Sequence, residues 1–173
     1  MLSKTIKKFL DQNKVKYEVL EHRTVYTAFD KAATLAASIG KITPAMVAKT
    51  VVVSLDGKDH ALGLIPSNKN LDKKRVLETF NKLQKKTGQK NYKKIDFAKE
   101  QWMKKNIKGV KVGTTPPFGV LYKLPFFIDN TLIKQSNIVV NGGVYEISIK
   151  LSPASLIKLD KSTLKGSFSM AKK

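Results

Sequence analysis

Residues 138–159 read IVVNGGVYEISIKLSPASLIKL, and this stretch carries the strongest information about the fold. The β-prone run Asn137–Val140 leads into Asn141-Gly142-Gly143, whose residue types favour a tight hairpin turn. Val144–Leu151 has the composition of a returning strand, and Ser152-Pro153 is typical of the start of a helix. The stretch therefore predicts a β-hairpin followed by a short helix.

Further strands are expected in the middle of the chain. Ala48–Leu55 (AKTVVVSL) is the most β-prone segment, and Asp56-Gly57 turns it toward a second strand, His60–Pro66. Three shorter segments follow: a strand at residues 110–112, the loop GTTPPFG at residues 113–119 and the strand FFID at residues 126–129. Together with the hairpin, these segments supply the strands of a sheet.

Helices are expected mainly in the first two thirds of the chain. The first covers residues 3–13 after a serine cap, and alternation over residues 15–19 predicts a half-buried strand behind it. A second helix is expected over residues 27–37, which open with a T-x-x-D capping pattern and precede Gly40. Two more helices are expected: a lysine-rich one at residues 71–87, capped by Asn70, and one at residues 95–106.

The order of these elements favours one α+β (mixed α/β) domain over residues 1–160, with a barrel-like mixed β-sheet surrounded by helices. The length of 173 residues fits a single domain. Residues 161–173 are polar and basic and are expected to form a flexible tail. No apolar run reaches the roughly 20 residues that a membrane helix needs, so we expect a cytoplasmic protein without a membrane partner.

The chain is strongly basic, with 33 Lys and Arg against 13 Asp and Glu and a formal charge of +20. Its 42% hydrophobic residues exclude a disordered basic peptide, and the charge favours a polyanionic partner such as RNA. Only two of the basic residues are arginines, which argues against reading of DNA base edges. The densest stretch, residues 82–111, is the first candidate for phosphate contacts, although a general bias toward lysine explains the excess about as well.

Three features could build a reactive site without cysteine or metal. The chain has no cysteine, and His22 and His60 lack a metal-ligand spacing, so neither a metal nor a cofactor is expected. Lys49 begins an apolar strand, Gly113 could offer a backbone N–H, and the turn at Asn141 adds an amide. Taken singly, each has an ordinary structural explanation as a strand end, a connecting loop or a hairpin turn.

The order of these motifs is more specific than any one of them. Over residues 3–160 the chain resembles the YbaK family in four motifs. These are the second-position lysine of AKTVVV, the G-x-x-x-P-F-G loop, the F-x-I-D strand and the V-N-G-G-x-x-x-I-x-I-x-L-S-P ending. That family comprises aminoacyl-tRNA deacylases and editing domains associated with prolyl-tRNA synthetase. A histidine-containing segment that precedes the second helix in family members is similar to Glu21–Thr24.

The resemblance implies hydrolysis of a mischarged small amino acid, with Ala preferred over Cys or Ser, from tRNA(Pro). The enzyme would be free-standing or linked to a prolyl-tRNA synthetase in cis or in trans. The family's catalytic positions fall on Lys49, which would hold the terminal adenosine's phosphate or the acyl carbonyl, and on Gly113, whose N–H would bind the ester carbonyl. The resemblance assigns substrate binding to His22, Thr115, Pro117, Phe118, Gly119, Asn141, Gly142 and Gly143.

Two positions depart from the family pattern. Asn141 stands where members often have Ser, and Ser148 stands where some have an acid. Because the chain has no cysteine and no apparent Ser-His-acid order, a scheme without a protein nucleophile is favoured, in which a ribose hydroxyl of the tRNA helps to activate water. The departures leave two alternatives open: a non-catalytic tRNA- or RNA-binding module with the same fold, and a basic RNA-binding protein unrelated to editing.

Overall fold

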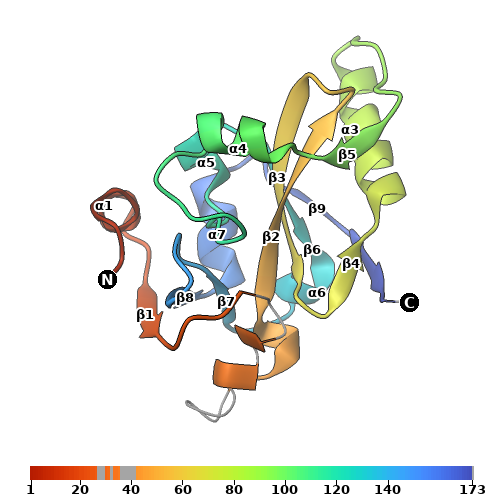
Figure 1. The fold of residues 1–173 in the computed structure, drawn as a ribbon. Coiled ribbons are helices and arrows are strands. Elements are labelled where there is room, and N and C mark those ends of the chain that lie inside the picture. Colours follow the sequence, from red (N-terminus) through yellow and green to blue (C-terminus); the bar gives the residue numbers. More distant parts are fainter. Residues whose placement is uncertain (27–29, 32, 36–41, 173) are drawn as a thin grey trace.

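An open five-stranded sheet forms the centre of the molecule (Figure 1). The structure, a computed structural model, describes residues 1–26, 30–31, 33–35 and 42–172. In spatial order the strands are β5 (Ile95–Phe97), β2 (Ala48–Leu55), β3 (Asp59–Pro66), β6 (Phe126–Asp129) and β9 (Leu164–Gly166). Strand β2 is antiparallel to β3 and β5, whereas β3, β6 and β9 run parallel. The expected mixed α/β fold is confirmed, and within the described chain the sheet does not close into a barrel.

A second sheet has three antiparallel strands, in the order β1 (Tyr17–Glu21), β8 (Ile147–Leu151) and β7 (Ile138–Asn141). Strands β7 and β8 form the expected hairpin. A parallel bridge joins Val47, just before β2, to Val139 on β7. From this bridge the two segments run in the same direction, and Lys49 and Asn141 each lie two residues further along. They therefore lie near each other between the two sheets.

Successive side chains on the strands of the central sheet point to opposite faces, and both faces of the sheet are buried. Val52, Leu62 and Ile128 lie in a cluster that also contains residues of the second sheet. Val53 and Phe127, on the opposite face, pack into a cluster that includes residues of the lysine-rich helix at residues 73–86. The sheet is therefore a rigid support for the residues at its strand ends.

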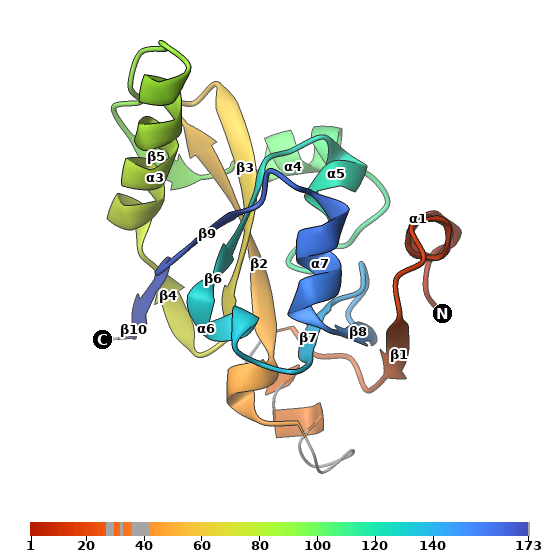
Figure 2. The same cartoon turned by 180° about the vertical axis from the view of Figure 1, so that it is seen from behind.

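The helices lie around the two sheets (Figures 1 and 2). They are α1 (Lys4–Gln12), the 3-10 helix η1 (Pro44–Met46), α3 (Lys73–Lys86), α4 (Glu100–Asn106), α5 (Gly119–Tyr122), α6 (Asn130–Ile133) and α7 (Pro153–Leu159). Helices α1 and α3 stand at opposite sides of the molecule in both views. Across the described residues, no helix combines the length and the apolar character that crossing a membrane requires.

Several local predictions are confirmed by the backbone geometry. Ser3 caps α1, where its Oγ accepts a hydrogen bond from the Ile6 N–H at 3.3 Å. Asp56 and Gly57 turn the β2–β3 hairpin with positive φ angles of 55° and 68°. The predicted helix at residues 27–37, with its T-x-x-D cap and its end at Gly40, lies largely outside the described residues, although residues 30, 31 and 33–35 are helical.

Other local predictions are wrong. The expected helix at residues 95–106 begins only at Glu100, because Ile95–Phe97 pair with β2 as strand β5. Asp72 rather than Asn70 caps α3, since residues 69–71 form strand β4. Residues 110–112 form no strand, and the Lys111 N–H instead donates to the Gly143 carbonyl at 2.9 Å. Each error falls where a contact distant in sequence decides the local structure.

The segment after residue 160 is packed against the domain and is not the flexible tail that its composition indicated. Strand β9 adds to the central sheet beside β6, and β10 (Ser169–Ala171) pairs with β4 (Lys69–Leu71). Between these strands, Phe168 is 1% exposed and lies in the same core cluster as Phe127. A single buried aromatic residue thus anchors a segment that is otherwise polar.

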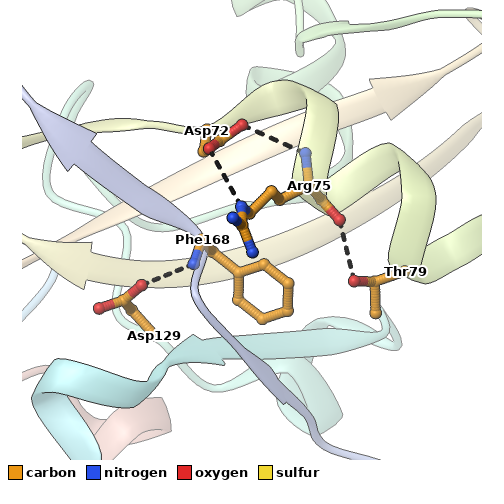
Figure 3. A network of polar contacts seen from close by, with 5 residues as sticks. All are labelled: Asp72, Arg75, Thr79, Asp129 and Phe168. Carbon is orange, nitrogen blue, oxygen red and sulfur yellow. Dashed lines mark hydrogen bonds and ion pairs between the residues drawn. The ribbon is translucent and has the colours of Figure 1, made fainter.

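Two aspartates hold the backbone of Phe168, and Figure 3 shows the bond to Asp129. Its N–H donates to Asp129 Oδ1 at 2.7 Å, and its carbonyl accepts from the Asp72 N–H at 2.7 Å. Asp129 is 1% exposed and also accepts from the N–H and hydroxyl of Thr131. The aspartate of the F-x-I-D motif therefore joins β6, α6 and the C-terminal segment.

We expect Asp129→Ala to lower the free energy of unfolding by about 1–3 kcal/mol, because it leaves the buried Phe168 N–H without an acceptor. Urea unfolding followed by circular dichroism measures this change. Asp160→Ala is a matched control, since Asp160 accepts from the Ser162 N–H in an exposed hydrogen bond. Equal stability of the Asp129→Ala variant and the control would contradict the anchoring role.

Candidate active site

A cavity of about 190 Å³ lies where the start of β2, the end of β7 and the loop at Gly113 meet. Its lining residues are Val25, Tyr26, Lys31, Lys49, Thr50, Gly113, Thr114, Asn141 and Tyr145. Three of them, Lys49, Gly113 and Asn141, are the residues that the sequence selected from three separate motifs. The bridge between Val47 and Val139 brings Lys49 and Asn141 together, and backbone hydrogen bonds to Gly143 hold the Gly113 loop beside them.

Gly113 presents an exposed backbone N–H at the cavity wall. Its φ of +79° is a conformation that residues with a Cβ adopt at a cost, and a Cβ built there would meet no atom within 4 Å. The loop is fixed on both sides of Gly113, since Lys111 and Thr114 exchange backbone hydrogen bonds with Gly143. No acceptor for the Gly113 N–H is found among the described residues. This N–H can therefore donate to a ligand carbonyl.

Lys49 lies on β2 opposite Ile65, half-buried at the end of an apolar strand. Burial lowers the pKa of the Lys49 ammonium, and the positive charge of Lys172 lowers it further. Lys172 follows β10, so the segment after residue 160 also affects the electrostatics of the cavity. An anion bound at Lys49 would relieve both effects.

Lys31 is a second lysine of the cavity, and sequence reasoning missed it. Its side chain is buried, and its Nζ donates to Asn141 Oδ1. Burial lowers the pKa of Lys31 to about 8. The one signal in the sequence was a lysine inside an alanine-rich helical run, a pattern that ordinarily places the lysine in solvent.

The Asn141 side chain connects Lys31 to the Gly113 loop. While its Oδ1 accepts from Lys31, its Nδ2 approaches the Gly113 carbonyl at 3.5 Å. The amide is 7% exposed and is therefore held in one orientation by its partners. An asparagine at this position is not a nucleophile, but it sets the position of a cation and of the loop that carries the N–H donor.

His22 lies beside the cavity rather than in its lining. Its Nδ1 is 2.8 Å from the Arg23 carbonyl, which can only accept, so Nδ1 carries the proton and Nε2 accepts from the Ser148 hydroxyl at 2.9 Å. Burial lowers the pKa of His22, and the charge of Lys31 lowers it as well. Because Ser148 is fully buried on β8, this pair braces the strand that faces Asn141.

A second cavity of about 270 Å³ adjoins the first and shares Thr50 and Gly113 with it. Its lining is mostly apolar and comes from Val51, Val52, Phe97, Ala98, Met103, Ile107, Val110 and Val112, with Thr115 and a few charged residues. The buried Thr50 Oγ1 has no hydrogen-bond partner among the described residues. Gly113 thus stands between a cationic cavity and an apolar one.

The other sequence-selected residues lie outside the lining of the cationic cavity. Phe118 is buried in the main core cluster against Phe9, and Gly119 packs tightly on the Leu124 carbonyl. Pro117 lines the same small core cavity as these two residues. Gly142 and Gly143 form the β7–β8 turn, and Gly143 fixes the Gly113 loop through its backbone. Thr115 lies in the apolar cavity only.

The described residues contain no group of three or more His, Cys, Asp or Glu side chains that could hold a metal ion. The polar atoms of the cationic cavity are lysine ammonium groups, hydroxyls, an amide and backbone groups. Such a set can hold an anion, orient a carbonyl and stabilise an oxyanion.

Comparison with known proteins places this geometry in a family. Residues 22–159 match the aminoacyl-tRNA editing domain family, and no curated protein matches the chain. A solved structure described as hypothetical protein APE2540 is 17% identical with a TM-score of 0.74, covering 96% of this chain and 100% of its own. A proposed trans-editing enzyme for prolyl-tRNA synthetase is 20% identical with a TM-score of 0.71, covering 99% of this chain and 100% of its own.

At these identities the two structures show a shared fold, whereas the family match includes Lys49, Gly113 and Asn141 and spans most of the chain. The residues that build the cavity therefore lie inside the matched region. The chain belongs to the aminoacyl-tRNA editing domain family.

Proposed function

We propose that the protein is a deacylase that hydrolyses the ester of a mischarged small amino acid, most simply alanine, on tRNA(Pro). The observation that carries this proposal is the convergence of Lys49, Gly113 and Asn141 on one cavity. The family match supports editing in general, and the similarity to a proposed trans-editing enzyme for prolyl-tRNA synthetase supports the choice of tRNA. The enzyme would act in the cytoplasm, alone or together with a prolyl-tRNA synthetase.

The cavity suits ester hydrolysis without a protein nucleophile. Water adds to the ester carbonyl carbon, and the Gly113 N–H donates to the oxyanion that forms on the carbonyl oxygen. The tetrahedral intermediate collapses by breaking the bond to the ribose oxygen, which takes up the proton that the water gives up. A neighbouring ribose hydroxyl orients the water, while Lys49 holds the nucleotide phosphate and fixes the ester beside Gly113.

The two adjoining cavities match the two ends of such a substrate. Phosphate is anionic and fits the lysine-lined cavity, whereas an aliphatic aminoacyl side chain fits the apolar one. The ester between them would lie at Gly113, which both cavities share. A hydrophobic pocket discriminates one methylene by only about 1–3 kcal/mol, so selection of alanine over close analogues is expected to be graded.

The basic surface supplies a path for the rest of the tRNA. Exposed lysines lie on α3 and on the residues after it, and Lys73 at the start of α3 places its Nζ 4.4 Å from the ring centroid of Phe97, which is 53% exposed. Phe97 also lines the apolar cavity, so this surface and the site are continuous. The affinity for tRNA is therefore expected to fall steeply with salt, as it does whenever lysines displace counterions from phosphates.

A deacylation panel tests the proposal. The protein, at substoichiometric concentration, is incubated with tRNA(Pro) charged with Ala, Cys, Ser or Pro, and release of free amino acid is followed with time. We expect turnover with alanine and little with proline. Binding of the tRNA without release would favour the non-catalytic module, and neither binding nor release would refute an editing function for this chain.

A further inference from the structure

Lys31 occupies an unusual position for a lysine. It is 6% exposed, whereas lysines on helices normally extend their ammonium groups to water. Its Nζ instead turns inward to Asn141 Oδ1, a neutral acceptor on strand β7 of the three-stranded sheet. Burial of an ammonium group without an opposite charge destabilises a fold, so a purely structural role would be better served by an apolar side chain.

The described lining of the cavity offers Lys31 no protein counter-charge. The residues that line it include two lysines, and none of the described lining residues is Asp or Glu. A ligand group placed here therefore meets two cations and no anion. A substrate α-ammonium group is disfavoured at this end of the cavity, and a phosphate is favoured.

We propose that Lys31, held by Asn141, is a second phosphate ligand that binds the same anionic group as Lys49. The phosphate is the one on the 5′ side of the terminal adenosine of the RNA, so the inference rests on the proposed function. Lys49 approaches from the strand end of β2, and Lys31 approaches from the helical residues 30–35. With a pKa of about 8, Lys31 is mostly protonated at neutral pH and can act as the cation.

The proposal also gives Asn141 a role. A serine at this position is too short to reach both Lys31 and the Gly113 carbonyl, whereas the amide contacts both. Asn141 would therefore couple the phosphate ligand to the loop that carries the oxyanion donor. It is a positioning residue, because it acts through Lys31 and Gly113.

Binding measurements that do not depend on turnover test the role of Lys31. Affinities for adenosine, adenosine 5′-monophosphate and the trinucleotide CCA are measured by calorimetry for the wild type, Lys31→Met and Lys134→Met. Lys134 is an exposed lysine at the end of α6, so its replacement removes the same charge from the surface. We expect the wild type to bind the monophosphate about 100-fold more tightly than adenosine, because Lys49 and Lys31 each add one charge-assisted contact worth about tenfold.

In Lys31→Met this preference for the monophosphate should fall about tenfold while the affinity for adenosine stays the same. Lys134→Met should keep the preference. If the phosphate belongs to an RNA end, the affinity for CCA should change across the variants in the same way as the affinity for the monophosphate. If the site takes only free nucleotides, CCA should not bind. An unchanged preference in Lys31→Met, or no preference in the wild type, would overturn the proposal.

Folding is checked on the same samples by thermal unfolding. Lys31→Met removes a buried ammonium group but also leaves Asn141 Oδ1 without its donor, so its unfolding temperature should stay close to that of the wild type. If Lys31→Met does not fold, Lys31→Gln, which still donates to Asn141, provides the same comparison. A wild type that binds phosphate with the Lys31 dependence but releases no amino acid would refute the deacylase function and leave the phosphate site standing.

Discussion

Replacing Lys49 by methionine is expected to lower kcat/KM for release of alanine from Ala-tRNA(Pro) by about 100-fold or more. The methionine keeps the volume of the side chain and its packing on β2, but it removes the cation that positions the ester beside Gly113. Single-turnover deacylation with the enzyme in excess measures the loss on the chemical step. The fold should persist, because Lys49 is half-buried at a strand end.

Two further variants separate charge from geometry in this prediction. Lys49→Arg keeps the charge but changes the donor geometry, so its rate should fall between those of the wild type and Lys49→Met. Lys134→Met removes a distant surface charge and should leave kcat/KM within about twofold, as expected for a screened exposed lysine. Release of alanine by Lys49→Met at the wild-type rate would exclude Lys49 from the reaction.

Phe127→Ala is expected to lower the free energy of unfolding by about 3–5 kcal/mol. Phe127 is fully buried on β6, and its ring makes edge contacts with Phe80 at 6.2 Å and Phe168 at 5.2 Å between centroids. Its removal leaves a cavity between the central sheet, α3 and the C-terminal segment. Urea unfolding measures the loss, and Phe97→Ala, at an exposed phenylalanine, should cost less than about 1 kcal/mol.

A double-mutant cycle with Gly63 tests the packing of this ring. A Cβ built on Gly63 of β3 would lie 2.0 Å from the Phe127 ring, so Gly63→Ala alone should destabilise the protein by about 1–3 kcal/mol. In the Phe127→Ala background the same methyl group enters the vacated space, and its cost should disappear. Additive effects of the two substitutions would mean that the ring does not lie against Gly63.

The sequence predicted those parts of the fold that local chemistry decides. The β2–β3 and β7–β8 hairpins were predictable because turn residues determine where the chain reverses. The convergence of Lys49 with Gly113 was predicted from the order of motifs, since no local pattern relates residues so far apart. The barrel-like mixed sheet that the sequence predicted is open in the described chain, with β9 at one edge and β5 at the other.

The parts that could not be predicted depend on distant contacts. Residues 95–97 became a strand because Asp56 Oδ1 accepts from the N–H groups of Lys93 and Lys94 and aligns this segment with β2. Lys31 was missed because its burial depends on Asn141, which lies 110 residues further along the chain. In the first case tertiary packing overrode an expected helix, and in the second it buried a lysine that an expected helix would have placed in solvent.

The strands β1 and β9, which flank the region matched by the family, limit which part of this chain can be transferred into another enzyme. The family match covers residues 22–159, yet β1 and α1 precede it and β9, β10 and Phe168 follow it. A transplant of the matched residues alone would carry the cavity but would expose an edge of each main sheet and open both core clusters. A portable module therefore needs α1 and β1 before the matched region and β9, Phe168 and β10 after it, and this C-terminal end also brings the charge of Lys172 toward Lys49.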